Sequence, residues 1–252
     1  MVANVSSLME HLDHLLEEGT EVFLLQEVRG SPDALDARLR GKGCSAVWGN
    51  VDEEGHAWTG VVARGGNIKR LDLPFLPVHW RHRVVAALWT PAQGPPISLV
   101  SLYGVTSAAV RDKEELNEVL LNLVEQAEQD GGRGWVIGGD RNVEAPELPV
   151  ASWMHACGWK DAGSEATCLA SRTRTAKRID VVFTNRFLQP SITDYRLSWD
   201  TGLHTHAAQY ITLAVGQNRL HQVWQSGRKY QPMQLTWSQR EALGSNLARS
   251  AR

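Results

Sequence analysis

The chain contains the stretch Trp135-Val136-Ile137-Gly138-Gly139-Asp140-Arg141-Asn142, in which an apolar triplet runs through two glycines into polar side chains. A short apolar run of this kind is typical of a strand that is buried on both faces. The glycine pair and the polar residues behind it indicate that the strand ends there and a turn begins. The stretch therefore predicts a buried strand that delivers Asp140 and Asn142 to its end.

Other polar residues occupy the same kind of position. Glu27 follows the apolar run 22–25, and His206 immediately precedes the last predicted strand. Asp180 lies inside the otherwise apolar run 179–183. Burial of an unpaired charge costs several kcal/mol, so Asp180 needs a partner, for which a histidine or a cation is the natural choice.

The rest of the chain alternates predicted helices with short predicted strands. Apolar residues at helical spacing predict helices over 6–18, 32–40, 111–128 and 149–157. Apolar and β-branched runs predict strands over 22–25, 44–48, 59–64, 83–89, 97–103, 135–137, 179–184 and 208–215. This alternation favours one layered α/β domain over residues 1–215.

Composition narrows the class of protein. No apolar run approaches the roughly 18 residues of a membrane span, and no secretory signal is present, which predicts an intracellular protein, nuclear or cytoplasmic, without a membrane partner. The three cysteines form no CxxC pair, so we interpret them as buried thiols or bystanders. After Gly216 six basic residues and one acid give a charge of +5, which leaves −7 on the remainder for the net −2. We interpret residues 216–252 as a basic appendage or linker.

The ordered motifs resemble the endonuclease/exonuclease/phosphatase superfamily, which includes AP endonucleases and DNase I-like enzymes. The matching motifs run in the family's order over about 1–215: Ala3-Asn4-Val5, Leu25-Gln26-Glu27, Leu102-Tyr103-Gly104, Gly139-Asp140-Arg141-Asn142, Arg178-Ile179-Asp180 and Thr205-His206. The resemblance implies a four-layer α/β/β/α sandwich, in which two packed mixed sheets are flanked by helices. It also implies a hydrolase that cleaves phosphodiesters with a divalent metal.

The resemblance also implies a role for each matched residue. Glu27 resembles the main ligand of Mg²⁺, with Mn²⁺ as an alternative, and Asn4 resembles a second contact on that side. Asp140 resembles the group that orients and deprotonates the attacking water, and Asn142 holds that water or a phosphate oxygen. Asp180 resembles the carboxylate that pairs with His206, which donates to the transition state. Tyr103 resembles a phosphate-side contact.

The sequence departs from the family's pattern at two motifs. The family usually shows Ser-Asp-His where this chain has His204-Thr205-His206, and the missing aspartate is often a second metal ligand. Arg141 replaces an apolar or aromatic residue, and is interpreted as a phosphate contact or a solvent-facing side chain. The short Asn-Val-Ser-Ser-Leu opening, the Thr-His ending and the basic tail resemble endonuclease domains of non-LTR retroelements. These domains nick target DNA and precede a reverse transcriptase in a longer polyprotein.

Several alternatives stay open at this point. Asn4 is also interpretable as a turn or cap residue, and Tyr103 as a half-buried strand aromatic. A basic cluster precedes Asp180, and is either a solvated hairpin or a phosphate track into the site: Arg172, Arg174, Lys177 and Arg178. The leading hypothesis is a DNA endonuclease. The alternatives are a phosphoesterase acting on a phosphoinositide or another small phosphoester, and a degenerate nucleic-acid-binding relic without catalysis.

Overall fold

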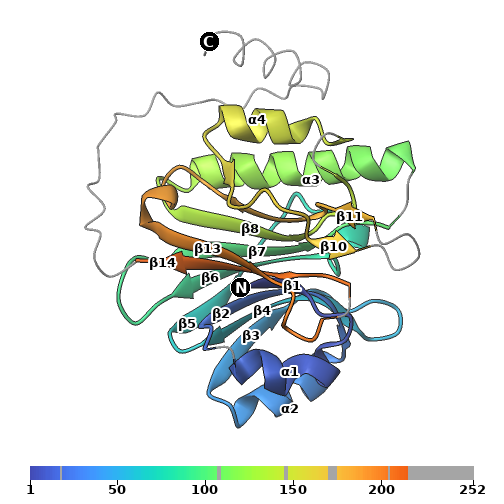
Figure 1. Ribbon diagram of the computed structural model, residues 1–252, viewed down its shortest axis with the longest axis vertical. Coiled ribbons are helices and arrows are strands. Elements are labelled where there is room, and N and C mark those ends of the chain that lie inside the picture. The colour runs from blue at the N-terminus through green and yellow to red at the C-terminus, as the bar shows by residue number, and fades with distance from the viewer. Residues whose placement is uncertain (18, 107–108, 145–146, 170–174, 204, 215–252) are drawn as a thin grey trace.

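Two β-sheets stack face to face between two pairs of helices in the computed structural model (Figure 1). The structure describes residues 1–17, 19–106, 109–144, 147–169, 175–203 and 205–214. The predicted appendage 216–252 lies outside the described residues. No helix of the described ranges is long and apolar enough to cross a membrane.

The first sheet has six strands in the order β13-β14-β1-β2-β4-β3. Its strands β1 and β2 run parallel, and its other neighbours are antiparallel, so the sheet is mixed. The strands span β1 Val2–Asn4, β2 Val22–Gly30, β3 Cys44–Trp48, β4 Ala57–Arg64, β13 Ile192–Ser198 and β14 Ala208–Leu213.

The second sheet also has six strands, in the order β5-β6-β7-β8-β12-β9. Strands β7 and β8 are its parallel pair, and the other neighbours are antiparallel. The strands span β5 Asn67–Leu71, β6 Val84–Thr90, β7 Ile97–Tyr103, β8 Gly134–Asp140, β9 Lys160–Asp161 and β12 Asp180–Thr184. A separate short hairpin joins β10 Cys168–Leu169 to β11 Ala176–Lys177.

Helices cover the outer face of each sheet. Helices α1 Leu8–Glu17 and α2 Pro32–Arg40 pack on the first sheet, and α3 Val110–Gln129 and α4 Val150–Ala156 pack on the second. The serine before α2 accepts a hydrogen bond from Ala34 N at 3.3 Å, and a proline at the first helical position suits the start of a helix. The described residues also form 3-10 turns at Val78–Trp80 and Gln189–Ser191.

The strand side chains alternate between two apolar layers. On β2, Phe23 and Leu25 join the cluster under α1 and α2, whereas Leu24 enters the layer between the sheets. On β8, Trp135 and Ile137 pack toward α3, and the residue between them faces the other sheet. Strands that are buried on both faces explain why their sequences read as unbroken apolar runs.

The predicted four-layer α/β/β/α architecture is confirmed. Each helix and strand that the sequence predicts is present, with ends shifted by a few residues. The first strand, β1, is only three residues long and ends at Asn4 of the motif Ala3-Asn4-Val5. The sequence missed the edge strands β5 and β13 and the two-residue strands β9, β10 and β11. Strands β5 and β13 have one neighbour each and carry many exposed polar residues, so their sequences lack the apolar run or clean alternation that marks a central strand.

Candidate active site

Strand ends from both sheets meet at one edge of the sandwich. The parallel pair β1–β2 aligns Asn4 with Gln26, next to Glu27. The parallel pair β7–β8 aligns Tyr103 with Asp140. Asp180 begins β12 directly opposite Asp140 on the antiparallel neighbour. The topology therefore brings the polar groups at these strand ends together.

Asp180 and His206 form the buried pair that the sequence predicts. The Nδ1 atom of His206 lies 3.0 Å from each carboxylate oxygen of Asp180, and both residues are buried. The buried hydroxyl of Thr167 accepts from Ile179 N at 3.3 Å and from Asp180 N at 3.0 Å, which anchors the start of β12. The carboxylate thus holds the imidazole in one orientation and leaves Nε2 directed away from Asp180.

The other ring nitrogen of His206 faces two further groups. Its Nε2 lies 3.9 Å from Asp140 Oδ2 and 3.8 Å from the Sγ of Cys168, a residue that bridges to His206 in an isolated β-pair. Burial disfavours the charged ring, but the hydrogen bonds with Asp180 and Cys168 and the nearby carboxylates raise the pKa of His206 to about 11. The ring is therefore an imidazolium at neutral pH, with an Nε2–H donor on the site side.

Asp140 stands between His206 and the first sheet. Its Oδ1 accepts from Asn142 N at 2.8 Å, and its Oδ2 accepts from Asn4 Nδ2 at 2.9 Å. Burial and the neighbouring Asp180 carboxylate raise the pKa of Asp140 to about 7, against the opposing effect of His206 and the two hydrogen bonds. A carboxylate with a pKa near the working pH is suited to accept a proton from water.

Glu27, Asn4 and Tyr103 form the other half of the site. Glu27 Oε1 accepts from Asn4 Nδ2 at 2.9 Å and from the Tyr103 hydroxyl at 3.0 Å. Glu27 Oε2 forms an ion pair with Arg29, whose side chain is half exposed. Burial and the charges of Glu27 and Asp140 raise the pKa of Tyr103, so its hydroxyl stays a donor. The Asn4 amide therefore connects the carboxylates of Glu27 and Asp140.

The backbone is unusual where it presents these groups. Glu27 has a φ of +53° and Asn142 a φ of +57°, values that non-glycine residues rarely adopt. The β2–β4 register shifts between Gln26 and Gly30, a β-bulge of the kind that re-aims side chains. A Cβ atom on Gly139 would lie 1.9 Å from Leu102 O, so β8 approaches β7 too closely for any side chain there.

A stack of rings and guanidinium groups supports Tyr103. Its ring lies parallel to the Trp58 ring, with centroids 5.7 Å apart. The Arg83 guanidinium lies 5.1 Å from the Tyr103 ring and 5.7 Å from the Trp58 ring, and it donates to Gly104 O at 3.0 Å. Asn142 Nδ2 donates to the same carbonyl at 3.0 Å. Sequence reasoning missed Trp58, which directly precedes the run 59–64, and Arg83, which begins the run 83–89, because nothing in the sequence distinguishes them from ordinary strand residues.

The donor set at this edge fits a hard divalent cation. The Asn4 amide holds Glu27 and Asp140 close together, and the buried Asp140 carboxylate has a raised pKa, as expected for negative charge that lacks full compensation. Ligand atoms of Asp140, Asp180 and His206 also lie within 4.8 Å of one another. Because Asp180 pairs with His206 and the raised pKa of Asp140 suits it to accept a proton, Glu27 is the better candidate, and oxygen ligands suit Mg²⁺. Asn4 Oδ1 accepts from Ser6 N at 3.2 Å, so Asn4 presents its NH₂ group to this space.

A second acidic group lies in the β3–β4 connection and has a structural explanation. Asp52, Glu54 and His56 offer ligand atoms within 4.8 Å of one another. Asp52 Oδ1 accepts from the backbone N–H groups of Glu54 and His56, and its Oδ2 accepts from Trp58 Nε1 at 2.6 Å. Asp52 therefore closes its own loop.

Arg141 differs from its predicted role. The sequence predicts a phosphate contact or a solvent-facing side chain, whereas the structure leaves Arg141 only 1% exposed. Adjacent strand residues point to opposite faces, so Arg141 leaves the site side that Asp140 occupies and lies 5.7 Å over the Phe183 ring. Within the described part of the chain, none of its three side-chain nitrogens has a hydrogen-bond partner. Burial lowers the pKa of this guanidinium to about 10, against the attraction of Asp161.

We expect the substitution Arg141→Met to stabilise the protein. A buried charge without hydrogen bonds is costly, and an apolar side chain of similar length removes that cost, so the free energy of unfolding should rise by about 1–3 kcal/mol. Urea denaturation at pH 7 measures the change. Arg141→Lys keeps the charge and should give no gain. A loss of stability in Arg141→Met would show that the guanidinium makes a favourable interaction.

The predicted basic cluster is only partly placed at the site. Arg178 forms a bidentate pair with Asp161, through Nη2 to Oδ1 at 2.6 Å and Nε to Oδ2 at 3.2 Å, so its charge is already neutralised. Lys177 is exposed on β11. Arg172 and Arg174, like His204, lie outside the described residues. A phosphate track through this cluster stays a prediction for Lys177 and Arg174, and the structure argues against it for Arg178.

Solved structures of similar fold include nucleases and a phosphatase bound to DNA. The 3′ phosphatase NExo from Neisseria, bound to a product DNA hairpin, matches 84% of this chain and 97% of its own with a TM-score of 0.69 at 19% identity. The endonuclease domain of TRAS1, a telomere-specific non-LTR retrotransposon, matches 86% and 97% with a TM-score of 0.64 at 15% identity. An AP endonuclease from Archaeoglobus fulgidus matches 85% and 98% with a TM-score of 0.67 at 14% identity. No protein-family model and no curated protein matches the sequence. The chain has the fold of the endonuclease/exonuclease/phosphatase structures.

Proposed function

We propose that the protein is a metal-dependent phosphodiester hydrolase that cleaves DNA. One observation carries the proposal: a continuous hydrogen-bonded array joins Glu27 through Asn4 to Asp140, beside the buried pair of Asp180 and His206. The array places cation ligands, a proton acceptor and a charged donor at one edge of the sandwich. Phosphoryl transfer needs these three elements and little covalent chemistry from the protein.

The proton acceptor and the donor face each other across the site. Asp140, with a pKa of about 7, is ionised in a large part of the molecules at neutral pH and accepts the proton of the attacking water. The imidazolium of His206 donates from Nε2 to a phosphoryl oxygen, where negative charge grows in the transition state. Asp180 holds that ring, and Tyr103 and Asn4 donate to Glu27 to keep its carboxylate in place.

Glu27 is the residue that would hold a divalent cation, and Asn4 would join it by turning its amide. Such a cation supplies a Lewis acid that neutralises charge on the phosphate oxygens. Mg²⁺ is the ion that this oxygen donor set favours, and Mn²⁺ is its closest substitute. Thr205 brings a neutral hydroxyl where a carboxylate is common in the family, so we expect weaker cation affinity at this site.

Two observations favour DNA as the substrate. The solved structures of similar fold include an enzyme bound to a DNA hairpin and a retrotransposon endonuclease domain, and these likenesses support the same substrate class here. The aromatic and guanidinium side chains of Trp58, Arg29 and Arg83 stand beside Glu27 and Tyr103, a combination that suits bases and phosphates. We propose that the chain is a retroelement-type nickase, which acts within a polyprotein that also contains a reverse transcriptase.

The substitution Glu27→Gln tests the metal and the activity together. Supercoiled plasmid incubated with the wild-type protein and Mg²⁺ should become open circles, and EDTA should abolish the reaction. Loss of the ligand charge in Glu27→Gln should raise the Mg²⁺ concentration for half-maximal nicking at least about tenfold, because changes even to the groups around metal ligands cost 10–100-fold. Glu118→Gln on the exposed face of α3 is the matched control and should behave as the wild type.

Other outcomes would redirect the assignment. Release of phosphate from inositol phosphates without plasmid nicking would move the substrate to a small phosphoester. Inactivity of the wild-type protein on plasmid, inositol phosphates and bis(p-nitrophenyl) phosphate would contradict a hydrolase and support a degenerate binding domain. Nicking that survives EDTA would contradict the metal requirement.

A further inference from the structure

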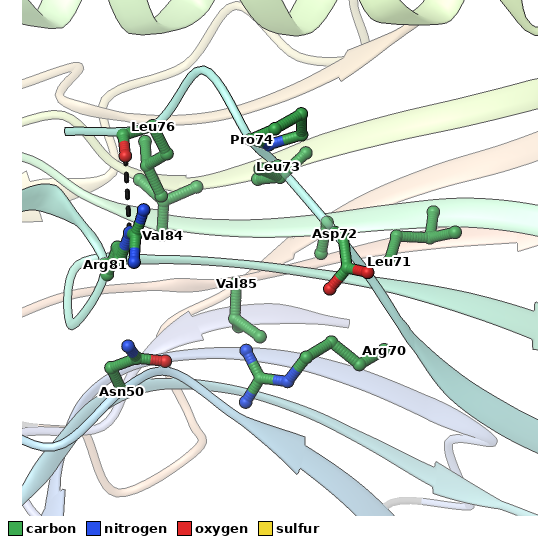
Figure 2. A pocket seen from close by; sticks show the side chains of 11 residues that line it. Asn50, Arg70, Leu71, Asp72, Leu73, Pro74, Leu76, Arg81, Val84 and Val85 are labelled. Carbon is green, nitrogen blue, oxygen red and sulfur yellow. Dashed lines mark hydrogen bonds between the residues drawn. The ribbon is translucent and has the colours of Figure 1, made fainter. Parts of the chain in front are cut away.

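A pocket of about 440 Å³ opens beside the candidate active site, between β5, β6 and the turn after β3 (Figure 2). Its lining contains three polar side chains that can bind a ligand: Asn50, Arg70 and Arg81. The apolar residues Leu76, Val84 and Val85 form part of its wall. Its lining includes none of the catalytic groups described above, so the pocket is a separate feature of the described chain.

The two arginines of the pocket lack acidic partners within the described ranges. Arg70 donates to the carbonyl of Trp48, and Arg81 Nε donates to Leu76 O at 3.4 Å, which fixes their positions. No ion pair joins either guanidinium to a carboxylate among the described residues, although Asp72 also lines the pocket. Their remaining N–H groups are therefore available to an anion. A guanidinium fork matches the oxygens of a phosphate with two parallel hydrogen bonds.

The pocket is adjacent to the reacting centre through the backbone. Asn50 N donates to Arg81 O at 2.9 Å, and Tyr103 N donates to Arg83 O at 2.8 Å. Arg81 and Arg83 are two residues apart, which an extended chain spans in at most about 7 Å. Tyr103 in turn donates to Glu27. Arg83 therefore lies over the ring of Tyr103, and Arg81, two residues before it in the chain, lines the pocket together with Arg70.

We propose that this pocket binds the backbone of a nucleic acid strand one or two nucleotides from the scissile phosphate, with Arg70 and Arg81 contacting phosphate and the apolar wall contacting a sugar or base. The inference rests on the proposed function and deepens it, because it makes the substrate a polymer. Asn50 adds a donor and an acceptor that can select an orientation of the strand.

Binding of a fluorescent DNA oligonucleotide in EDTA, followed by anisotropy over a range of salt concentrations, tests the pocket. The double variant Arg70→Ala with Arg81→Ala should bind at least about fivefold more weakly at 0.1 M salt. It should also lower the slope of log affinity against log salt by about 1–2, one for each phosphate that no longer meets a guanidinium. Arg40→Ala removes an exposed charge at the end of α2, at the opposite end of β3, and should leave affinity and slope unchanged.

Hydrolysis of bis(p-nitrophenyl) phosphate with Mg²⁺ separates this inference from the proposed function. The ratio of kcat/KM for the oligonucleotide to that for the small diester should fall about tenfold in the double variant. If the double variant has the same salt slope and the same ratio of kcat/KM values as Arg40→Ala, the pocket does not bind the strand, although the protein can still be a hydrolase. A wild-type protein that cleaves the small diester but does not bind DNA would overturn it too. A wild-type protein that binds DNA through Arg70 and Arg81 but cleaves neither substrate would support the pocket and sink the hydrolase.

Discussion

Asp140→Asn should lower the rate of metal-dependent cleavage by about 10²–10⁴-fold, the usual contribution of a general base. The amide cannot accept the proton of water, but it preserves the shape of the side chain and an oxygen for Asn142 N. Single-turnover nicking of plasmid at saturating Mg²⁺ measures the loss. Asp33→Asn, an exposed carboxylate in the first turn of α2, is the matched control and should keep full activity.

The same substitution should stabilise the metal-free protein, which gives a second readout. The folded-state pKa of Asp140 is about 7, raised from an ordinary value of 3.8. A carboxyl group with a raised folded pKa costs stability as the pH rises from about 4 through 7, and the cost is complete above that range. A neutral amide in its place removes that cost, although its NH₂ group no longer accepts the hydrogen bond from Asn4 Nδ2. We therefore expect Asp140→Asn to gain roughly 1–3 kcal/mol of stability at pH 8 without metal, measured as a higher unfolding temperature. A variant that is inactive because it is unfolded would show the opposite shift, and retained cleavage in a stable variant would remove Asp140 from the base role.

Asp180→Asn should abolish most of the activity by a different route. Asp180 holds the charged ring of His206, whose pKa is about 11 against an ordinary 6.5. Without the carboxylate, burial drives that pKa down toward or below 6.5, so the ring becomes neutral at pH 8. A loss of about 10³-fold or more is expected, similar to the effect of removing the orienting carboxylate of a catalytic histidine in serine proteases. The pH profile of cleavage shows whether the loss of the proton on His206 is the cause.

The sign of the pH dependence distinguishes orientation from simple damage. Wild-type activity should rise through about pH 7 as Asp140 ionises and then stay level until the pH approaches 11, where His206 loses its proton. The stability from the raised pKa of His206 is fully present below pH 6.5 and is lost as the pH rises through 11. In Asp180→Asn the alkaline limb should move down to about pH 6–7, near the ordinary histidine value. Asp194→Asn, an exposed group on β13, should keep the wild-type profile. An unmoved alkaline limb in Asp180→Asn would show that another group is the donor.

Part of the site could be predicted because strand ends carry a local signature. An apolar run followed by a polar residue marked Glu27 and Asp140 without any knowledge of their neighbours. Asp180 could be recognised because burial of an unpaired charge inside an apolar strand costs free energy, so the residue requires a partner. That partner is His206, whose Nδ1 lies 3.0 Å from the carboxylate. The resemblance to a family ordered these residues along the chain, and the topology of two parallel strand pairs explains why they converge.

The buried position of Arg141 was predictable from the alternation of side chains along a strand. Asp140 and Arg141 are neighbours at the end of a strand, and side chains of neighbouring strand residues point to opposite faces. If Asp140 faces the site, Arg141 must face α3 and α4. This chain places a guanidinium there, over the ring of Phe183.

The sequence by itself determined the alternation of helices and strands, the central strands and the chain positions of the polar groups, because periodicity and strand-end chemistry are local properties. Only the tertiary structure decided which groups touch. The contact of Asn4 with Asp140 joins residues 136 positions apart, and that of Cys168 with His206 joins residues 38 apart. The stack of Trp58, Tyr103 and Arg83 and the pocket of Arg70 and Arg81 likewise form across strands and connections. Such contacts depend on strand order, register and the separation of the two sheets, which no window of neighbouring residues encodes.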